Sequence, residues 1–305
     1  MKSIFFCIGY IIASTVCAFS QLPKTDILIT NIILSAGKMT ITKPVSICGK
    51  NSYNDEPVFS PDGKSILYIS HSDSLGHTEI YKYSTKTKTS AMFTSSADVK
   101  HTPAIMPDGK NVSFLAAEPP AHQRLWKMPL AGGAPELIFK DKDSIGNYCW
   151  MSSDSIALQV LKTPTSLQAV SISTGAAKMI AQNVSSCIKR MPSQLPIPGK
   201  WENCWIFIER TKDNKRTMES FVYGKKSKLV VMEVCPECSM LEGSENFCMA
   251  KAGIFSASGS KVYLFDSESQ TNWTEVADLS KYGIKNIKSI TFSPDEKKLL
   301  IVNTK

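Results

Sequence analysis

Short apolar runs separated by polar turns recur along the chain after residue 21. Runs such as residues 65–69 and 111–115 are rich in branched and aromatic side chains, which favour strands. Gly, Pro, Asp, Asn and Ser cluster between the runs, as is typical of turns. The pattern predicts an all-β protein of many short strands.

A turn motif repeats within this pattern. Glu56-Pro57-Val58-Phe59-Ser60-Pro61-Asp62-Gly63-Lys64 recurs 46 residues later at 102–110, and in altered form at 289–297 and 148–155. Pro presets φ, Asp can accept a hydrogen bond from the backbone two residues on, and Gly takes a positive φ. Each copy therefore predicts a hairpin whose aspartate is structural rather than catalytic.

Each repeat continues with a third and a fourth strand after a polar loop. In the second unit these are residues 124–128 and 136–139, with Gly132-Gly133 between them. Four strands per unit at a fixed period of this size predict the blades of a propeller. We place five blades at residues 46–96, 97–142, 143–184, 185–234 and 245–279.

The sixth blade is divided between the two ends of the chain. Residues 288–292 and 298–303 supply inner strands, and residues 26–30 and 38–42 supply the missing outer ones. Pairing the first and last segments closes the ring and covers two strand edges. The sequence thus predicts a six-bladed β-propeller as a single domain over residues 21–305. Seven blades are the alternative, because the fourth unit lacks the turn motif.

These xPxFSPDGK repeats resemble the TolB-type six-bladed propellers of the bacterial envelope. The resemblance covers nearly all of the chain after residue 21, with two specific copies of the motif and two degraded ones. It implies the fold strongly and a function weakly, because one propeller fold hosts many functions. TolB carries a separate N-terminal domain, and envelope relatives often carry an OmpA-type peptidoglycan domain. We expect neither here, because propeller strands begin at Asp26.

Residues 1–20 have the order of a secretory signal peptide. The basic start Met1-Lys2 precedes an apolar run over residues 4–16, and the small-x-small site Ala18-Phe19-Ser20 follows. A membrane anchor is the alternative, but the run is short for a span. Lipidation at Cys17 fits poorly after Val16. We expect a periplasmic or secreted protein with no transmembrane segment in the mature chain.

Composition changes this picture little. The chain has 305 residues, 43% hydrophobic and 20% charged, which is ordinary for a globular protein. The net charge of +8 comes from scattered basic residues, so we expect no nucleic-acid partner.

Seven cysteines follow the predicted cleavage site, and an exported protein can form disulfides. Cys235-Pro-Glu-Cys238 is a lone C-x-x-C with only Cys248 nearby, which is too few ligands for a structural zinc. It also lacks the helix expected after a redox-active pair. We predict a loop disulfide between Cys248 and either Cys235 or Cys238, with a redox or metal role as a minor alternative.

Polar residues just before the innermost strands should face the mouth of the central channel. They could hold a small polar ligand or the end of a peptide, although a solvated channel is the simpler interpretation. This predicted mouth comprises Asp55, Glu56, His101, Asn147, Tyr148, Arg190 and Lys288. Lys189 stands beside Arg190 in an uncertain register.

Trp201 and Trp205 flank a long apolar loop at residues 194–200, where an insertion replaces the worn turn motif. Such a loop can dock a partner, so we predict a partner-binding role for both tryptophans. Packing between blades is the competing interpretation.

The sequence contains no constellation typical of catalysis. It lacks a G-x-S-x-G motif, and its four histidines include His71 and His77, which flank an aspartate-containing polar loop. We expect no metal and no cofactor. The leading hypothesis is a non-enzymatic exported propeller that binds a protein of the cell envelope. The alternative is a carbohydrate-binding or carbohydrate-active propeller that uses the channel mouth.

Overall fold

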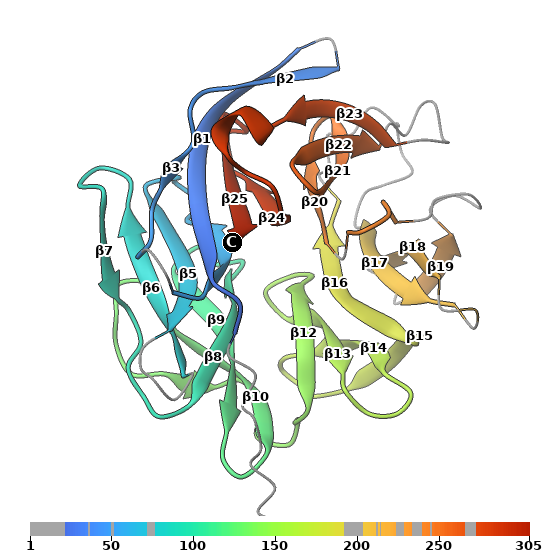
Figure 1. Cartoon of the computed structure of the whole chain (residues 1–305). Helices are drawn as coiled ribbons and strands as arrows, with labels where there is room; N and C mark the ends of the chain where they lie inside the picture. Colours follow the sequence, from blue (N-terminus) through green and yellow to red (C-terminus); the bar gives the residue numbers. More distant parts are fainter. Residues whose placement is uncertain are drawn as a thin grey trace, which may run out of the picture.

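The computed structural model describes residues 22–35, 37–49, 52–71, 77–191, 204–211, 213, 215–223, 229–233, 240–244, 246–265 and 273–305. Its strands form six antiparallel sheets set radially around a central axis (Figure 1). The predicted six-bladed β-propeller is confirmed. Within the ranges given, no helix is long and apolar enough to cross a membrane.

Blades one to five are four-stranded sheets of consecutive strands. In chain order they comprise β4 (Asn54–Phe59), β5 (Ser65–His71), β6 (Thr78–Ser84) and β7 (Thr89–Met92); β8 (Val99–Ile105), β9 (Asn111–Glu118), β10 (His122–Pro129) and β11 (Glu136–Leu137); β12 (Ile145–Trp150), β13 (Ser155–Val160), β14 (Ser166–Ser171) and β15 (Ala177–Gln182); β16 (Val184–Arg190), β17 (Cys204–Arg210), β18 (Arg216–Tyr223) and β19 (Leu229–Glu233); β20 (Phe247–Ala250), β21 (Gly253–Ser258), β22 (Lys261–Phe265) and β23 (Trp273–Asp278). Blade six combines β24 (Ile287–Phe292), β25 (Lys298–Thr304), β1 (Thr25–Ser35) and β2 (Lys38–Ile41), with β3 (Val45–Ser46) also paired to β1 and the 3-10 turn η1 (Ser280–Tyr282) before β24.

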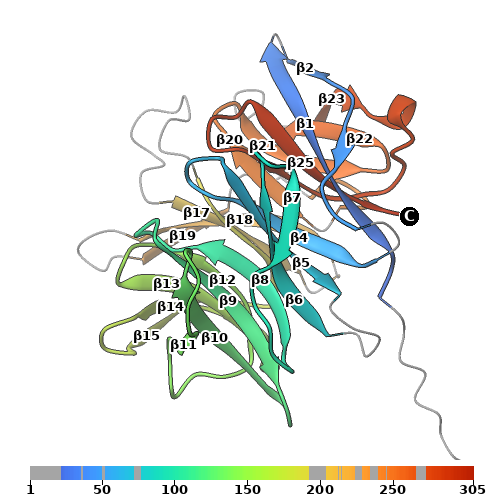
Figure 2. The ribbon, with the colours of Figure 1, turned by 90° about the vertical axis from the view of Figure 1, so that its left-hand side faces the viewer.

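Blade six joins the two ends of the chain. β1 pairs antiparallel with β25 from Thr25↔Thr304 to Asn31↔Lys298, and the side view shows the two strands alongside each other (Figure 2). β1 runs further than predicted: beyond Asn31 it leaves β25 and pairs with β2. Ile32 on this extension and Met39 on β2 pack into a cluster shared with blade five. The N-terminal segment therefore fastens two blades.

The hydrophobic core lies between the blades. Among the described residues, buried side chains form six clusters, and each cluster is shared by two adjacent blades. On β5, Ile66 and Tyr68 pack toward blade six, whereas Leu67 and Ile69 pack toward blade two. The second strand of a blade, such as β5, is buried on both faces, so it appears in the sequence as a continuous apolar run.

The repeated motif forms the predicted turn. Asp62 Oδ1 accepts hydrogen bonds from Ser60 Oγ at 2.6 Å and from the Lys64 N–H at 3.0 Å, and Gly63 has φ 66°. In the last copy Glu296 stands at the glycine position and still adopts φ 56°. The side-chain bonds of Asp295 there repeat those of Asp62, which shows that the aspartate, more than the glycine, holds this turn.

Closure of the ring predicts that alanine substitution at two isoleucines of β1 changes the free energy of unfolding by very different amounts. Ile27 is fully buried in the cluster with Leu300 and Val302, whereas Ile33 is 68% exposed. We expect Ile27→Ala to lower the free energy of unfolding by about 2–5 kcal/mol, because a buried cavity forms. The matched variant Ile33→Ala should change it by less than about 0.5 kcal/mol. Urea unfolding measures both, and equal effects would contradict this account of closure.

Candidate functional site at the channel mouth

The innermost strands carry β-bulges near the predicted channel residues. Register shifts fall between Asp55 and Val58, between His101 and Ala104, and also within the innermost strands of blades three, four and six. In blades one and two the bulge includes a residue with positive φ, Glu56 at 52° and Thr102 at 51°. A bulge re-aims side chains, so these positions differ from the regular alternation of a strand.

Asp55 is the anchor of the site. It is 4% exposed, and its Oδ2 accepts a hydrogen bond from the Tyr53 hydroxyl at 2.9 Å and forms an ion pair with Lys288 Nζ. Its Oδ1 accepts the Glu56 N–H at 2.8 Å. The Lys288 ammonium also lies 5.5 Å from the centre of the Tyr53 ring, a cation–π contact. Asp55 is thus satisfied within the protein and holds Lys288 in place.

Glu56 is the titratable group of the site. Burial, together with the neighbouring Asp55 charge, raises its pKa to about 7. The Thr102 N–H, which donates to Glu56 Oε2, and the ammonium groups of Lys288 and Lys189 limit that rise. A carboxyl group with this pKa exchanges its proton near neutral pH.

Equivalent positions of three blades are bonded together through Thr102. Glu56, Thr102 and Tyr148 are spaced 46 residues apart. The Thr102 N–H donates to Glu56, and its carbonyl oxygen accepts from the Tyr148 hydroxyl at 2.8 Å. Tyr148 is 4% exposed, and burial raises the pKa of its hydroxyl. Tyr148 therefore links blades rather than facing a ligand.

Two exposed cations stand on β16. The register places Lys189 opposite Ile206 and Arg190 opposite Trp205, which settles the position that the sequence left uncertain. The Lys189 charge acts on Glu56 of blade one, Cys149 of blade three and Cys248 of blade five. Its ammonium is therefore within electrostatic reach of residues in three other blades. Sequence reasoning missed this role because the bulge in β16 disrupts counting along the strand.

The other predicted mouth residues have mainly structural roles. Asn147 Oδ1 accepts the Tyr148 N–H at 2.7 Å, the same bond that Asp55 makes to Glu56. Burial, reinforced by the adjacent Lys100 charge, lowers the pKa of His101 to about 4, so its imidazole is neutral at physiological pH. The structure brings together Asp55, Glu56, Tyr148 and Lys288, and it adds Tyr53 and Lys189.

The predicted docking tryptophans need a correction. Trp205 is 2% exposed and stacks on Phe221 with ring centres 5.5 Å apart, so it belongs to the core between blades three and four. The Arg190 guanidinium makes a cation–π contact with Trp205, 5.7 Å from the ring centre. Packing between blades, the competing interpretation, describes Trp205. Trp201 and the loop 194–200 lie outside the described residues.

The cysteine prediction is only partly within the described residues. Cys248 is a free thiol, 7% exposed in the blade-five cluster, and burial raises its pKa. Cys235 and Cys238 lie outside the described residues, and the predicted disulfide of Cys248 is not present in this structure.

The histidines of the polar loops do not form a metal cluster in the described part of the chain. His122 Nδ1 lies 2.5 Å from Asp143 Oδ2, an exposed pair beside β10. No group of three or more His, Cys, Asp or Glu side chains suited to a metal ion occurs among the described residues.

Comparison with solved structures shows the same fold in proteins of different function. A structure described as TolB from Agrobacterium tumefaciens matches with a TM-score of 0.62 and 14% identity, over 93% of this chain and 99% of that one. A gluconolactonase from Xanthomonas campestris matches with a TM-score of 0.60 and 11% identity, over 93% of this chain and 97% of that one. A chain of the nidogen/laminin complex matches with a TM-score of 0.55 and 8% identity, over 92% of this chain and 98% of that one. No family model matches, and no curated protein matches. At these identities the likeness shows the fold alone.

The raised pKa of Glu56 predicts a pH-dependent stability. Between about pH 4.5 and 7 folded Glu56 keeps a proton that the unfolded chain has released, so the free energy of unfolding falls as pH rises through this window. Glu56→Gln removes this dependence. We expect the variant to be more stable than the parent at pH 8, by up to about 3 kcal/mol, and equal to it at pH 4.

The measurement is the difference between variant and parent in urea unfolding across this pH range, which cancels the opposite contribution of His101. Glu136→Gln, at an exposed glutamate of β11, is the matched control. A pH-independent difference for Glu56→Gln would contradict the assigned cause.

Proposed function

We propose that this protein is an exported β-propeller that binds an acidic segment of a protein partner at its channel mouth. Residues 1–20 act as the signal peptide, and residues 21–305 form the mature, periplasmic or secreted domain. The support for export is the order of basic, apolar and small residues in the first 20 positions.

The observation that carries the binding proposal is the charge balance of the mouth. Asp55 is occupied by Lys288 and Tyr53, and Glu56 accepts the Thr102 N–H and is half protonated near pH 7. Lys189 and Arg190 remain exposed on β16, and the Lys189 charge acts on Glu56. The mouth therefore presents surplus positive charge over a rigid, internally bonded floor, and such a surface attracts carboxylates.

Recognition of a protein also agrees with the fold comparison. The chain from the nidogen/laminin complex has this fold within a protein–protein assembly, and it covers nearly the same extent of the chain. In this proposal the blades are a rigid support, and specificity lies in the side chains at the mouth.

A second candidate function is catalysis at the same mouth. Glu56, with its pKa of about 7, could transfer a proton at neutral pH, and Lys189 could stabilise a developing anion beside it. The gluconolactonase among the similar structures is an enzyme with this fold. A sugar lactone or acidic saccharide would be the substrate class to test.

The binding proposal predicts the effect of reversing the surplus charge. We expect a fluorescein-labelled hexaglutamate peptide with a free carboxyl terminus to bind the mature chain, and binding to weaken as salt is added. Lys189→Glu/Arg190→Glu should raise the Kd at least about tenfold. Fluorescence anisotropy measures the Kd.

The matched control is Lys86→Glu/Lys110→Glu, which makes the same charge change at exposed lysines of blades one and two. Equal losses in both double variants would indicate attraction by net charge alone and would overturn the assignment to the mouth. Glu56→Gln distinguishes the two functions, because it should abolish turnover in an enzyme and leave peptide binding in place.

A further inference from the structure

A cavity lies between blades one and two. It has a volume of about 180 Å³ and is bounded by residues 93–98 after β7 and by strands β9 and β10. A cavity of about 150 Å³ with apolar walls is large enough to hold benzene. This cavity therefore has room for one six-membered ring, and it is smaller than the roughly 300 Å³ or more of drug-sized sites.

One part of the cavity wall is apolar. Phe93, Phe114, Trp126 and Met128 line it, and Phe114 and Met128 are almost completely buried. Trp126 is only half-buried, so one part of the indole faces open space. Flat aromatic surfaces of this kind pack against flat apolar faces of a ligand.

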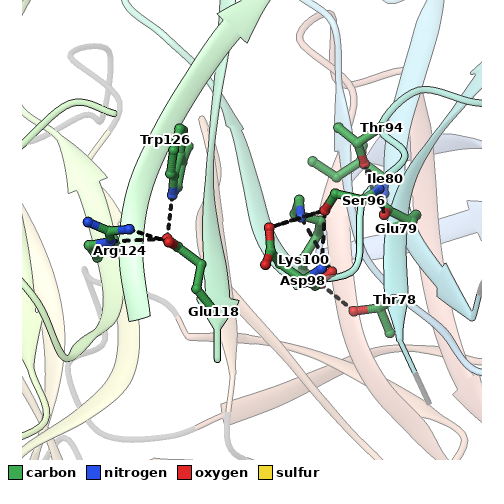
Figure 3. Close-up of polar contacts among 10 residues, drawn as sticks. All are labelled: Thr78, Glu79, Ile80, Thr94, Ser96, Asp98, Lys100, Glu118, Arg124 and Trp126. Carbon is green, nitrogen blue, oxygen red and sulfur yellow. Dashed lines mark hydrogen bonds and ion pairs between the residues drawn. The ribbon is translucent and has the colours of Figure 1, made fainter. Parts of the chain in front are cut away.

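The other part of the wall is polar and rigidly held. Lys100 has a side chain only 5% exposed, and its Nζ donates to Ser96 Oγ and to Asp98, whose Oδ2 lies 3.3 Å away. Buried Glu79 fixes this segment by accepting the Thr94 hydroxyl and the Ser96 N–H (Figure 3). The polar groups are therefore in place before any ligand arrives.

A second ion pair fixes the indole. The Glu118 carboxylate accepts hydrogen bonds from Nε and Nη2 of Arg124. Its Oε1 also accepts a hydrogen bond from Trp126 Nε1–H at 2.8 Å (Figure 3). The Arg124 guanidinium lies 5.8 Å from the centre of the Trp126 ring. Asp98 is close enough to Glu118 and Arg124 for their charges to interact.

We propose that this cavity binds a single pyranose ring of a neutral saccharide. Asp98 is paired with Lys100 and Glu118 with Arg124, and buried Glu79 accepts hydrogen bonds from Thr94 and Ser96, so a charged ligand finds no surplus partner. Lys100 Nζ already donates to Ser96 Oγ and to the carbonyl and Oδ2 of Asp98, so the partly exposed Asp98 carboxylate is the acceptor that a ligand hydroxyl can use. A pyranose has a hydroxylated edge for the polar wall and a C–H face for Trp126. The lining does not include Asp55, Glu56, Tyr148, Lys288 or Lys189, so the site differs from the one proposed at the channel mouth.

The experiment titrates the mature chain with methyl β-D-glucopyranoside, methyl β-D-galactopyranoside and methyl α-D-mannopyranoside, followed by saturation-transfer NMR. Phenol and glucuronate are the comparison ligands. We expect saturable binding of at least one neutral glycoside, and a Kd raised at least about tenfold by Trp126→Ala and by Asp98→Asn.

Trp273→Ala is the matched control, because Trp273 is also a half-buried strand tryptophan packed on a phenylalanine, in blade five. It should leave the Kd unchanged, as should Lys189→Glu at the channel. Asp98→Asn keeps the side-chain shape and tests the site if Trp126→Ala perturbs folding, which circular dichroism reports. Absence of glycoside binding, tighter binding of phenol or glucuronate, or binding that survives Asp98→Asn would overturn the proposal.

Discussion

Every blade of this protein is buried on both faces, and the rest of the structure depends on that constraint. A single four-stranded sheet with two apolar faces is unstable in water, so each blade needs a neighbour on either side. The requirement ends only when the ring closes. β1 and β25 provide closure, with Ile27, Leu300 and Val302 facing blade one, while Leu299 and Ile301 face blade five.

The ring in turn determines what the centre can do. Innermost strands bring polar residues from distant parts of the chain together, and bulges turn them toward one another. Most of the acceptors there are used to bind blade to blade, as in the bonds through Thr102. The cationic side chains of Lys189 and Arg190 stay exposed.

The fold was readable from the sequence because its signals are local. The Pro-Asp-Gly turns depend on side-chain bonds within five residues, and continuous apolar runs mark strands buried on both faces. The same continuity hides orientation: in Cys204–Arg210, Trp205 and Phe207 face blade three while Ile206 and Ile208 face blade five. No periodicity distinguishes them, so the sequence does not separate a partner-binding Trp205 from one packed between blades. Lys189 and the cavity beside Trp126 depend on bulges and long-range packing, which leave no local signal.

The closure of blade six also has a mechanical side. The ladder between β1 and β25 begins at Thr25↔Thr304, so the outer ends of both strands lie at the same edge of the sheet, and Lys305 N–H donates there to the Lys24 carbonyl at 3.0 Å. Tension applied between these two ends loads one residue pair at a time and peels the ladder open, whereas tension along the strands would load all pairs together. The strand pair that closes the ring therefore resists a force that separates the two chain ends less well than a force directed along the strands.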